Sequence, residues 1–180
     1  MKKQLILSAI AAVALGAPAA SMAESLDFNY KVDRFADIEV LRYKVPDFEQ
    51  LTIQQKELVY YLTEAALYGR DILTDQNGKY NLAIRTTLEN IYKNYDGSKD
   101  DADYKGFVLY LKQVWFANGI HHHYSTDKFT PQFSQAFFET QVKKLSKKQL
   151  PFRKGQTVDA FLKEITPVIF DPTVMAKRVN

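Results

Sequence analysis

Apolar residues recur at three- and four-residue spacing through most of this chain, in stretches separated by short polar turns. That spacing places the apolar side chains on one face of an α-helix, whereas a strand would need strict alternation. The pattern predicts a mainly α fold with about five helices. Their expected positions are 53–73, 80–94, 102–118, from Thr130-Pro131 onwards, and from Thr157 to near Pro167.

Local signals indicate several helix ends. Thr52, with Gln55 three residues later, has the sequence pattern of a capping box at the start of the first helix. Gly119 can adopt a positive φ at the end of the third helix, and Pro131 suits the first turn of the fourth, with Thr130 as its cap. After the fifth helix, residues 168–172 are expected to form an apolar, extended tail.

A different pattern precedes the helices. Leu26, Phe28, Tyr30 and Val32 alternate with polar residues, and the region 26–45 is rich in β-branched and aromatic residues. This alternation predicts a short N-terminal β region. If most of the sheet is formed by other parts of the protein, the region is expected as a lone hairpin or as coil.

The N-terminus has the sequence of a secretory signal peptide. A basic start precedes an apolar run over 5–15, which is too short to span a bilayer, and the small-x-small sequence Ser21-Met-Ala23 follows. We therefore expect residues 1–23 to be a signal peptide and residues 24–180 to be the mature, exported chain, periplasmic or secreted.

Charge and cysteine content exclude several classes of protein. Without the lysines of the signal peptide, the 24 basic residues fall close in number to the 21 acidic ones, so global charge supports neither a nucleic-acid partner nor a membrane-surface partner. Because cysteine is absent, a lipid anchor on an N-terminal cysteine and a thiolate metal ligand are excluded.

Two charged runs have a simple explanation. The acidic residues of 96–103 precede the third helix, and the basic residues of 143–154 follow the fourth. Negative charges favour the N-terminal end of a helix and positive charges the C-terminal end, so each run complements the dipole of its helix. We interpret both runs as solvated surface, in preference to a calcium loop or an anion-binding surface.

All three histidines, His121, His122 and His123, lie between the third and fourth helices, in a run that begins with the only tryptophan, Trp115. Imidazole is a common metal ligand, but consecutive side chains diverge, and no other histidine or cysteine completes a tetrahedral set. A polar loop with one or two histidines bonded to backbone is therefore favoured over a metal site. Phosphate-loop, Gly-x-Ser-x-Gly and His-Glu-x-x-His sequences are absent.

The run Asn118-Gly-Ile-His-His-His-Tyr124-Ser-Thr-Asp-Lys128-Phe-Thr-Pro131 resembles the N-terminal recognition loop of the dipeptidyl peptidase III family. These enzymes are zinc metallopeptidases that remove dipeptides from peptide N-termini, and the chain is most similar to the bacterial branch. The flanking sequences Ile38-Glu-Val-Leu-Arg-Tyr-Lys-Val-Pro46 and Trp115-Phe-Ala agree, so the resemblance covers about residues 26–180.

The resemblance implies a larger, two-lobed peptidase with its peptide substrate in the cleft between the lobes. Family members bind zinc through a His-Glu-x-x-x-His helix and a later Glu, which this chain lacks. The chain is therefore expected to be an N-terminal fragment that binds no metal, contributes no catalytic residue and hydrolyses nothing alone. Missing polypeptide is expected to leave exposed apolar surface around 168–170 and in the strand region.

The resemblance also implies substrate-binding residues. Tyr124 corresponds to an aromatic residue that contacts a substrate side chain, and Asn118, His121, His122 and His123 would line the same wall of the cleft or pack only within the loop. The expected partners are a peptide and the remainder of the polypeptide. The alternative is a complete, non-enzymatic helical binding or adaptor protein that uses the 115–131 loop to hold a partner.

Overall fold

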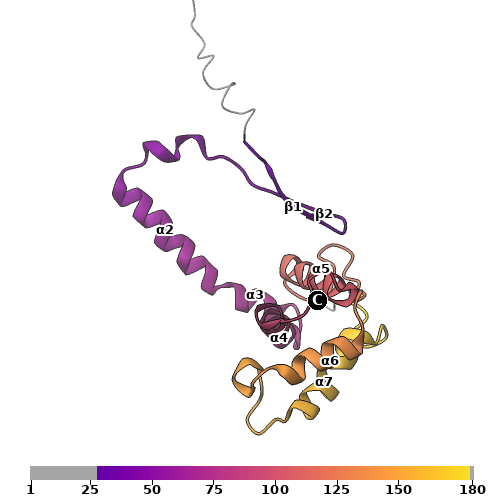
Figure 1. Ribbon diagram of the computed structural model, residues 1–180. Helices are drawn as coiled ribbons and strands as arrows, with labels where there is room; N and C mark the ends of the chain where they lie inside the picture. The colour runs from indigo at the N-terminus through magenta and orange to yellow at the C-terminus, as the bar shows by residue number, and fades with distance from the viewer. Residues whose placement is uncertain (1–27, 179–180) are drawn as a thin grey trace, which may run out of the picture. The chain divides into compact units, whose positions relative to one another are not determined.

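The computed structural model describes residues 28–178, and the predicted signal peptide lies outside the described residues. The mainly helical fold with a short antiparallel sheet near the N-terminus is confirmed (Figure 1). The chain divides into two compact units at Lys44 and Val45. Within residues 28–178, no helix is both long enough and apolar enough to cross a membrane.

The first unit contains a β-hairpin. Strand β1, Lys31–Phe35, pairs antiparallel with β2, Ile38–Leu41, and the register is irregular between Lys31 and Asp33. Ile38 is buried, whereas Val32 and Tyr43 are exposed. The predicted β region is therefore a lone hairpin, an arrangement that is marginally stable by itself.

The second unit starts with a 3₁₀ turn, η1, Pro46–Gln50, and then helix α2, Ile53–Tyr68. The predicted capping box is present: the Gln55 amide donates to Thr52 Oγ1 at 3.3 Å, and the Thr52 amide donates to Gln55 Oε1 at 2.9 Å. The prediction of one helix over 53–73 is wrong, because a turn at Gly69 separates α2 from α3, Arg70–Gln76. Glycine is a poor helix former, which favours the break at this position.

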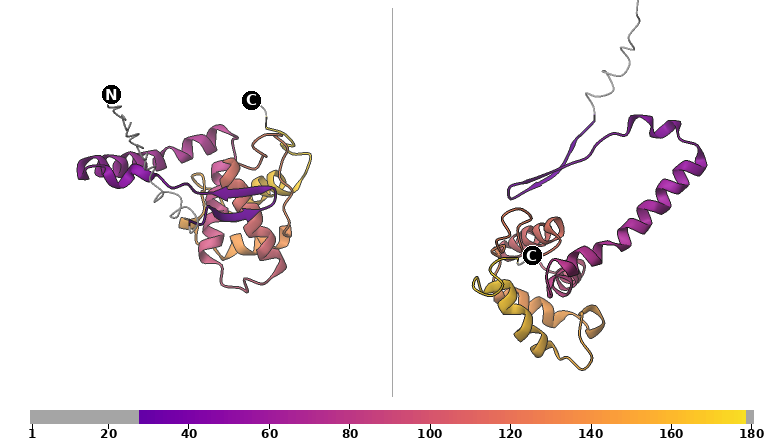
Figure 2. Two further views of the ribbon diagram at one scale, coloured as in Figure 1. Left: turned by 90° about the horizontal axis from the view of Figure 1, so that it is seen from above. Right: turned by 180° about the vertical axis from the view of Figure 1, so that it is seen from behind.

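Helix α2 has no buried residue, although it carries apolar side chains on all sides. Its exposed large apolar residues include Ile53, Leu58, Val59, Tyr60, Tyr61, Leu62, Leu67 and Tyr68. Figures 1 and 2 show α2 extending away from helices α4 to α7. A helix that is apolar all round is usually buried in the assembled protein.

Helices α4, Asn81–Asn94, and α5, Ala102–Ala117, form the centre of the core. Ile84, Leu88 and Ile91 form the buried face of α4. In α5, Leu111 is buried, whereas Trp115, four residues later, is exposed. The buried α5 residues are Tyr104, Phe107, Tyr110, Leu111 and Val114, which recur at three- and four-residue spacing and form one face of the helix.

Helix α5 ends at Asn118, which adopts the left-handed conformation with φ 53°. Asparagine tolerates left-handed backbone. Gly119, which was expected to adopt a positive φ at this helix end, does so directly after Asn118. Its φ is 154°, and a Cβ there would lie 2.3 Å from Nδ2 of Asn81.

Helix α6, Gln135–Lys144, begins later than predicted. Thr130 and Pro131 remain in the loop, and Ser134 is the N-cap, with its hydroxyl accepting a bond from the Phe137 amide at 3.1 Å. The carboxylate of Asp103 accepts bonds from the amide and the hydroxyl of Ser134 at 2.6 and 2.8 Å. This tertiary contact from α5 determines where α6 begins, and local sequence signals do not reveal it.

After a 3₁₀ turn, η2, Lys147–Gln149, the last helix is α7, Val158–Phe170, which begins at the predicted cap Thr157. The prediction of a helix end near Pro167 and an extended tail is wrong. Val168 and Ile169 are helical and buried, and their burial offsets the hydrogen bond that Pro167 cannot make. Figures 1 and 2 show α6 and α7 side by side.

The expected exposed apolar surface around residues 168–170 is therefore not found. In the described residues, large exposed apolar side chains are found in the strand region, as expected, and also on α2.

Candidate functional site: an exposed aromatic and histidine loop

The histidine run forms a narrow loop between α5 and α6, as predicted. The Phe129 amide donates to the Ile120 carbonyl at 2.9 Å, and the His122 amide donates to the Asp127 carbonyl at 2.8 Å. Ile120 and Phe129 are buried and anchor the base of the loop in the core. The tip of the loop consists of residues 123–126.

His121 is 2% exposed and lies inside the base of the loop. Its Nε2 is 2.7 Å from the carbonyl oxygen of Met175, to which the neutral ring donates a hydrogen bond. Burial lowers the pKa of His121, although the bond to Met175 acts in the opposite direction. Lys128 and Arg178 add to the lowering, because their positive charges disfavour a second cation.

His122 holds the tip of the loop through its Nδ1 atom. Its Nδ1 accepts hydrogen bonds from the backbone amides of Tyr124, at 3.2 Å, and Ser125, at 3.1 Å. Because both partners are donors, Nδ1 must be unprotonated, which places the hydrogen of the neutral ring on Nε2. Two of the three histidines thus bond to backbone.

Tyr124 is exposed at the tip of the loop, and the half-buried His123 ring packs beside it. The His123 ring packs 4.9 Å from the Phe116 ring and 4.2 Å from the Tyr124 ring, measured between centroids. Tyr124 is 85% exposed. A fixed backbone and a largely exposed aromatic ring give a surface that can contact an apolar or aromatic side chain of a ligand.

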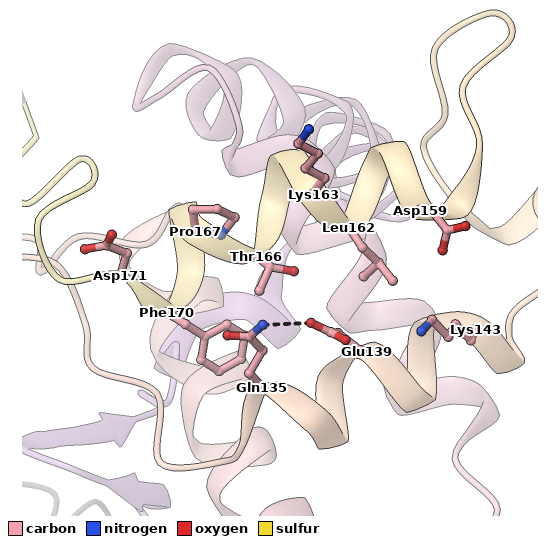
Figure 3. Close-up of a pocket in the computed structure, with 10 residues that line it drawn as sticks. All are labelled: Gln135, Glu139, Lys143, Asp159, Leu162, Lys163, Thr166, Pro167, Phe170 and Asp171. Carbon is pink, nitrogen blue, oxygen red and sulfur yellow. Dashed lines mark hydrogen bonds between the residues drawn. The ribbon is translucent and has the colours of Figure 1, made fainter.

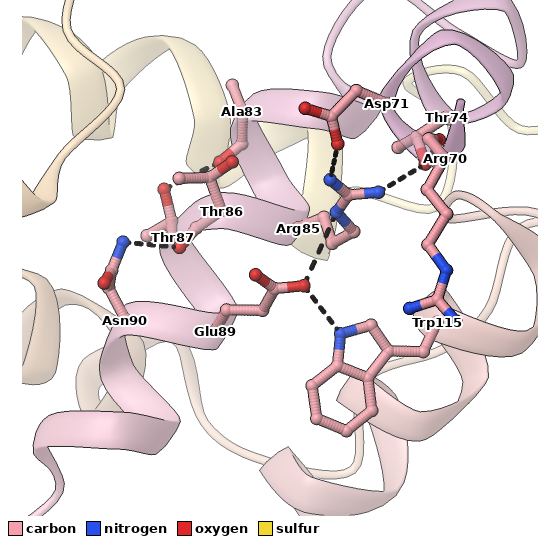
Figure 4. Close-up of polar contacts among 10 residues, drawn as sticks. All are labelled: Arg70, Asp71, Thr74, Ala83, Arg85, Thr86, Thr87, Glu89, Asn90 and Trp115. Carbon is pink, nitrogen blue, oxygen red and sulfur yellow. Dashed lines mark hydrogen bonds and ion pairs between the residues drawn. The ribbon is translucent and has the colours of Figure 1, made fainter. Parts of the chain in front are cut away.

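Trp115, at the end of α5, is held by a polar network that joins three helices (Figure 4). Its Nε1 donates to Glu89 of α4 at 2.9 Å, and Glu89 lies 3.5 Å from Nε of Arg85. The guanidinium of Arg85 also contacts Asp71 and donates to Thr74 of α3 at 2.8 Å. Trp115 therefore has a fixed position beside the loop.

Lys128 joins the loop to the end of α7. Its ammonium donates to the carbonyl oxygens of Val168 at 3.0 Å, Val174 at 2.8 Å and Asp171. Three donors therefore meet three acceptors. Burial lowers the pKa of Lys128, and the Asp171 carboxylate opposes this shift.

The segment that follows α7 pairs with residues 126–128, the returning limb of the loop. The Lys128 amide donates to the Ala176 carbonyl at 3.1 Å, and the Arg178 amide donates to the Thr126 carbonyl at 3.0 Å. The side chains of Asp127 and Lys177 form an ion pair at 3.2 Å. The pKa of Asp127 is lowered by hydrogen bonding to Ser125 and by Lys177.

The predicted site residues therefore occupy different places. Tyr124 and His123 meet at the exposed tip, and His122 lies directly beneath them. His121 is buried, and Asn118 is the cap of α5, with its carbonyl accepting a bond from Asn77 at 3.2 Å. Residues 28–178 contain no cluster of three or more His, Cys, Asp or Glu side chains that could hold a metal ion.

A concave region separate from the loop lies between α6 and α7 (Figure 3). It is a groove of about 530 Å³ whose lining includes Glu139, Lys143, Thr166 and Phe170. Its lining contains none of the residues that were predicted from the sequence as substrate-binding.

Sequence reasoning missed Lys128 and Arg85 as organising residues. Lys128 stands in the quoted loop sequence, but the partners of its ammonium lie 40 to 46 positions away. No family model of known proteins matches this chain, and no curated protein matches it. The fold and the loop define a helical protein with an exposed aromatic loop.

Proposed function

We propose that this chain is the substrate-positioning, N-terminal part of an exported zinc dipeptidyl peptidase that removes dipeptides from peptide N-termini. The observation that carries the proposal is Tyr124, an aromatic ring that is 85% exposed on a loop with a fixed backbone. The rings of His122 and His123 lie beside it, while His121 is buried at the base of the loop and Asn118 caps α5. The chain supplies binding groups and no catalytic group.

The rigidity of the loop supports a role in binding. The amides of Tyr124 and Ser125 are both bonded to His122, so the tip does not have to order when a ligand arrives. Ordering a loop on binding costs free energy, and a preformed loop avoids that cost. An exposed tyrosine contributes contact area while losing little rotamer entropy.

The exposed apolar residues of α2 support the second part of the proposal, a larger enzyme. Leu58, Tyr61 and Leu62 are three and four residues apart, so they lie on one side of this helix, and all are exposed. Contiguous exposed apolar surface is typical of an interface. In the proposed enzyme, a further segment of the polypeptide covers α2.

Zinc held by that further segment would activate water and polarise the scissile carbonyl. The residues of this chain would hold the substrate so that its first peptide bond stays in place. Tyr124 would contact one substrate side chain, and the His123 ring behind it would limit the space available.

The alternative is a complete, non-enzymatic binding or adaptor protein that uses the same loop. The closed core favours it: Ile84, Phe107 and Ile169 are fully buried among α4, α5 and α7 without any other segment. Under this alternative, the loop binds a protein partner and no hydrolysis occurs in any longer form of the polypeptide.

The test is hydrolysis of a dipeptidyl-naphthylamide together with the zinc content of the purified protein. The 180-residue chain is expected to bind no stoichiometric zinc and to release no naphthylamine. A longer form carrying the zinc motif is expected to do both, with Tyr124→Ala raising KM about tenfold at unchanged kcat. Stoichiometric zinc and turnover by the 180 residues alone would contradict the proposal.

A further inference from the structure

The tip of the loop is held by an imidazole in a role usually taken by an Asn or Asp side chain. In such turns a side-chain oxygen accepts the amide two residues later in the chain. Here His122 Nδ1 accepts the amides two and three residues later, at 3.2 and 3.1 Å. The backbone of Tyr124 is therefore fixed by a nitrogen that can be protonated.

Protonation of that nitrogen would reverse its role. A protonated ring carries N–H groups on both nitrogens and accepts no hydrogen bond, so the amides of Tyr124 and Ser125 would both lose their acceptor.

We propose that His122 is a positioning residue for Tyr124, and that the loop holds a peptide firmly only while the His122 ring is neutral. The proposal rests on the peptide-positioning function proposed above. Imidazole is the side chain whose charge ordinarily changes between about pH 5 and pH 8, so the loop would respond to the acidity of its compartment.

Several charged and titratable groups face His122. The Asp127 carboxylate interacts with the ring electrostatically, and Lys177 pairs with Asp127 at 3.2 Å. The His123 ring lies 4.4 Å from the His122 ring, and His121 lies at the base of the loop near Lys128 and Arg178. The Phe129 ring is an apolar neighbour of His122, with 6.0 Å between the two ring centroids.

Substitution by asparagine separates the hydrogen-bonding role from the titration. The side-chain oxygen that His122→Asn introduces can accept the same two amides, and it does not titrate. His122→Ala removes the acceptor at every pH. Because His122→Asn retains the cap, it remains informative even if His122→Ala fails to fold.

The first measurement requires no ligand. In the ¹⁵N-labelled chain, the ring of His122 is expected to be the Nε2–H tautomer near pH 8, and the amide shifts of Tyr124 and Ser125 are expected to follow the protonation of that ring. In His122→Asn these shifts should stay constant between about pH 8 and pH 5. An Nδ1–H tautomer, or tip amides that do not follow His122, would overturn the proposal.

The second measurement is binding of an unblocked tetrapeptide by calorimetry. From about pH 8 to about pH 5 the wild-type Kd is expected to rise about tenfold, because two hydrogen bonds are lost. The Kd of His122→Asn should change by less than about twofold over the same range. The surface variant Lys154→Gln should follow the wild type. A His122→Asn variant that weakens like the wild type overturns the proposal.

The two measurements distinguish the two proposals. If the tip amides follow His122 but no peptide binds at any pH, the positioning of Tyr124 by His122 is supported and the peptide-binding function fails. If peptide binds with the same affinity across the range, the function is supported and the role of His122 in it is overturned.

Discussion

The ammonium of Lys128 lies 3.0 Å from the carbonyl oxygen of Val168, so a residue of the exposed loop caps the C-terminal end of α7. A cation at this end of a helix also meets the negative end of the helix dipole. The contact couples the loop to the core, because Val168 is itself buried.

Replacing Lys128 by methionine approximately retains the side-chain length and removes the cap. Three carbonyl oxygens would then lack their donor, and the free energy of unfolding is expected to fall by about 2 to 4 kcal/mol. Urea unfolding followed by circular dichroism measures this change. Lys154→Met, on the surface, should change it by less than about 0.5 kcal/mol, and an equal effect of both variants would contradict the role of Lys128.

Tyr110 is 1% exposed, and its hydroxyl has no hydrogen-bond partner among residues 28–178. Burial accordingly raises the pKa of Tyr110. Tyr110→Phe removes an unsatisfied polar group without creating a large cavity, so the free energy of unfolding is expected to rise by about 1 kcal/mol. Thermal unfolding tests this, with the exposed Tyr68→Phe as a control; a decrease would show that the hydroxyl has a partner.

Two leucines distinguish the core from α2. Leu88 is fully buried, whereas Leu62 is 60% exposed. Leu88→Ala is expected to lower the free energy of unfolding by about 2 to 5 kcal/mol, and Leu62→Ala by less than about 1 kcal/mol. If Leu62→Ala is as costly as Leu88→Ala in the isolated chain, α2 packs against something within it.

His121 should make stability depend on pH. Its pKa in the folded protein is lowered, so between that pKa and the ordinary value of 6.5 the unfolded chain binds more protons than the folded one. The contribution is fully present above about pH 6.5 and is lost as the pH falls through the folded pKa. Urea unfolding between about pH 7.5 and pH 5 should show a steeper loss for the wild type than for His121→Gln; parallel curves would contradict the assignment.

Helix positions could be predicted where the deciding signal is local. The caps at Thr52 and Thr157 depend on residues three positions away, and both are present. The continuation of α7 through Pro167 could not be predicted, because it depends on the burial of Val168 and Ile169 by other helices. Tertiary packing outweighs the local helix-breaking tendency of proline there.

In the candidate site, too, local features could be predicted and tertiary contacts could not. The sequence pattern located the loop, and the family resemblance pointed to Tyr124 within it. It did not separate His121 from His122, because burial against Met175 and a bond to the loop's own amides depend on the folded path of the chain. The support from Lys128 depends on partners 40 to 46 positions away.

Calorimetry with an unblocked tetrapeptide tests most directly whether Tyr124 contacts a bound peptide. Tyr68 provides a matched control, because it is also 85% exposed but lies on α2. Tyr124→Ala is expected to weaken binding about tenfold, while Tyr68→Ala leaves it unchanged. Equal affinities for the wild type and Tyr124→Ala, or no saturable binding by the wild type, would contradict the account.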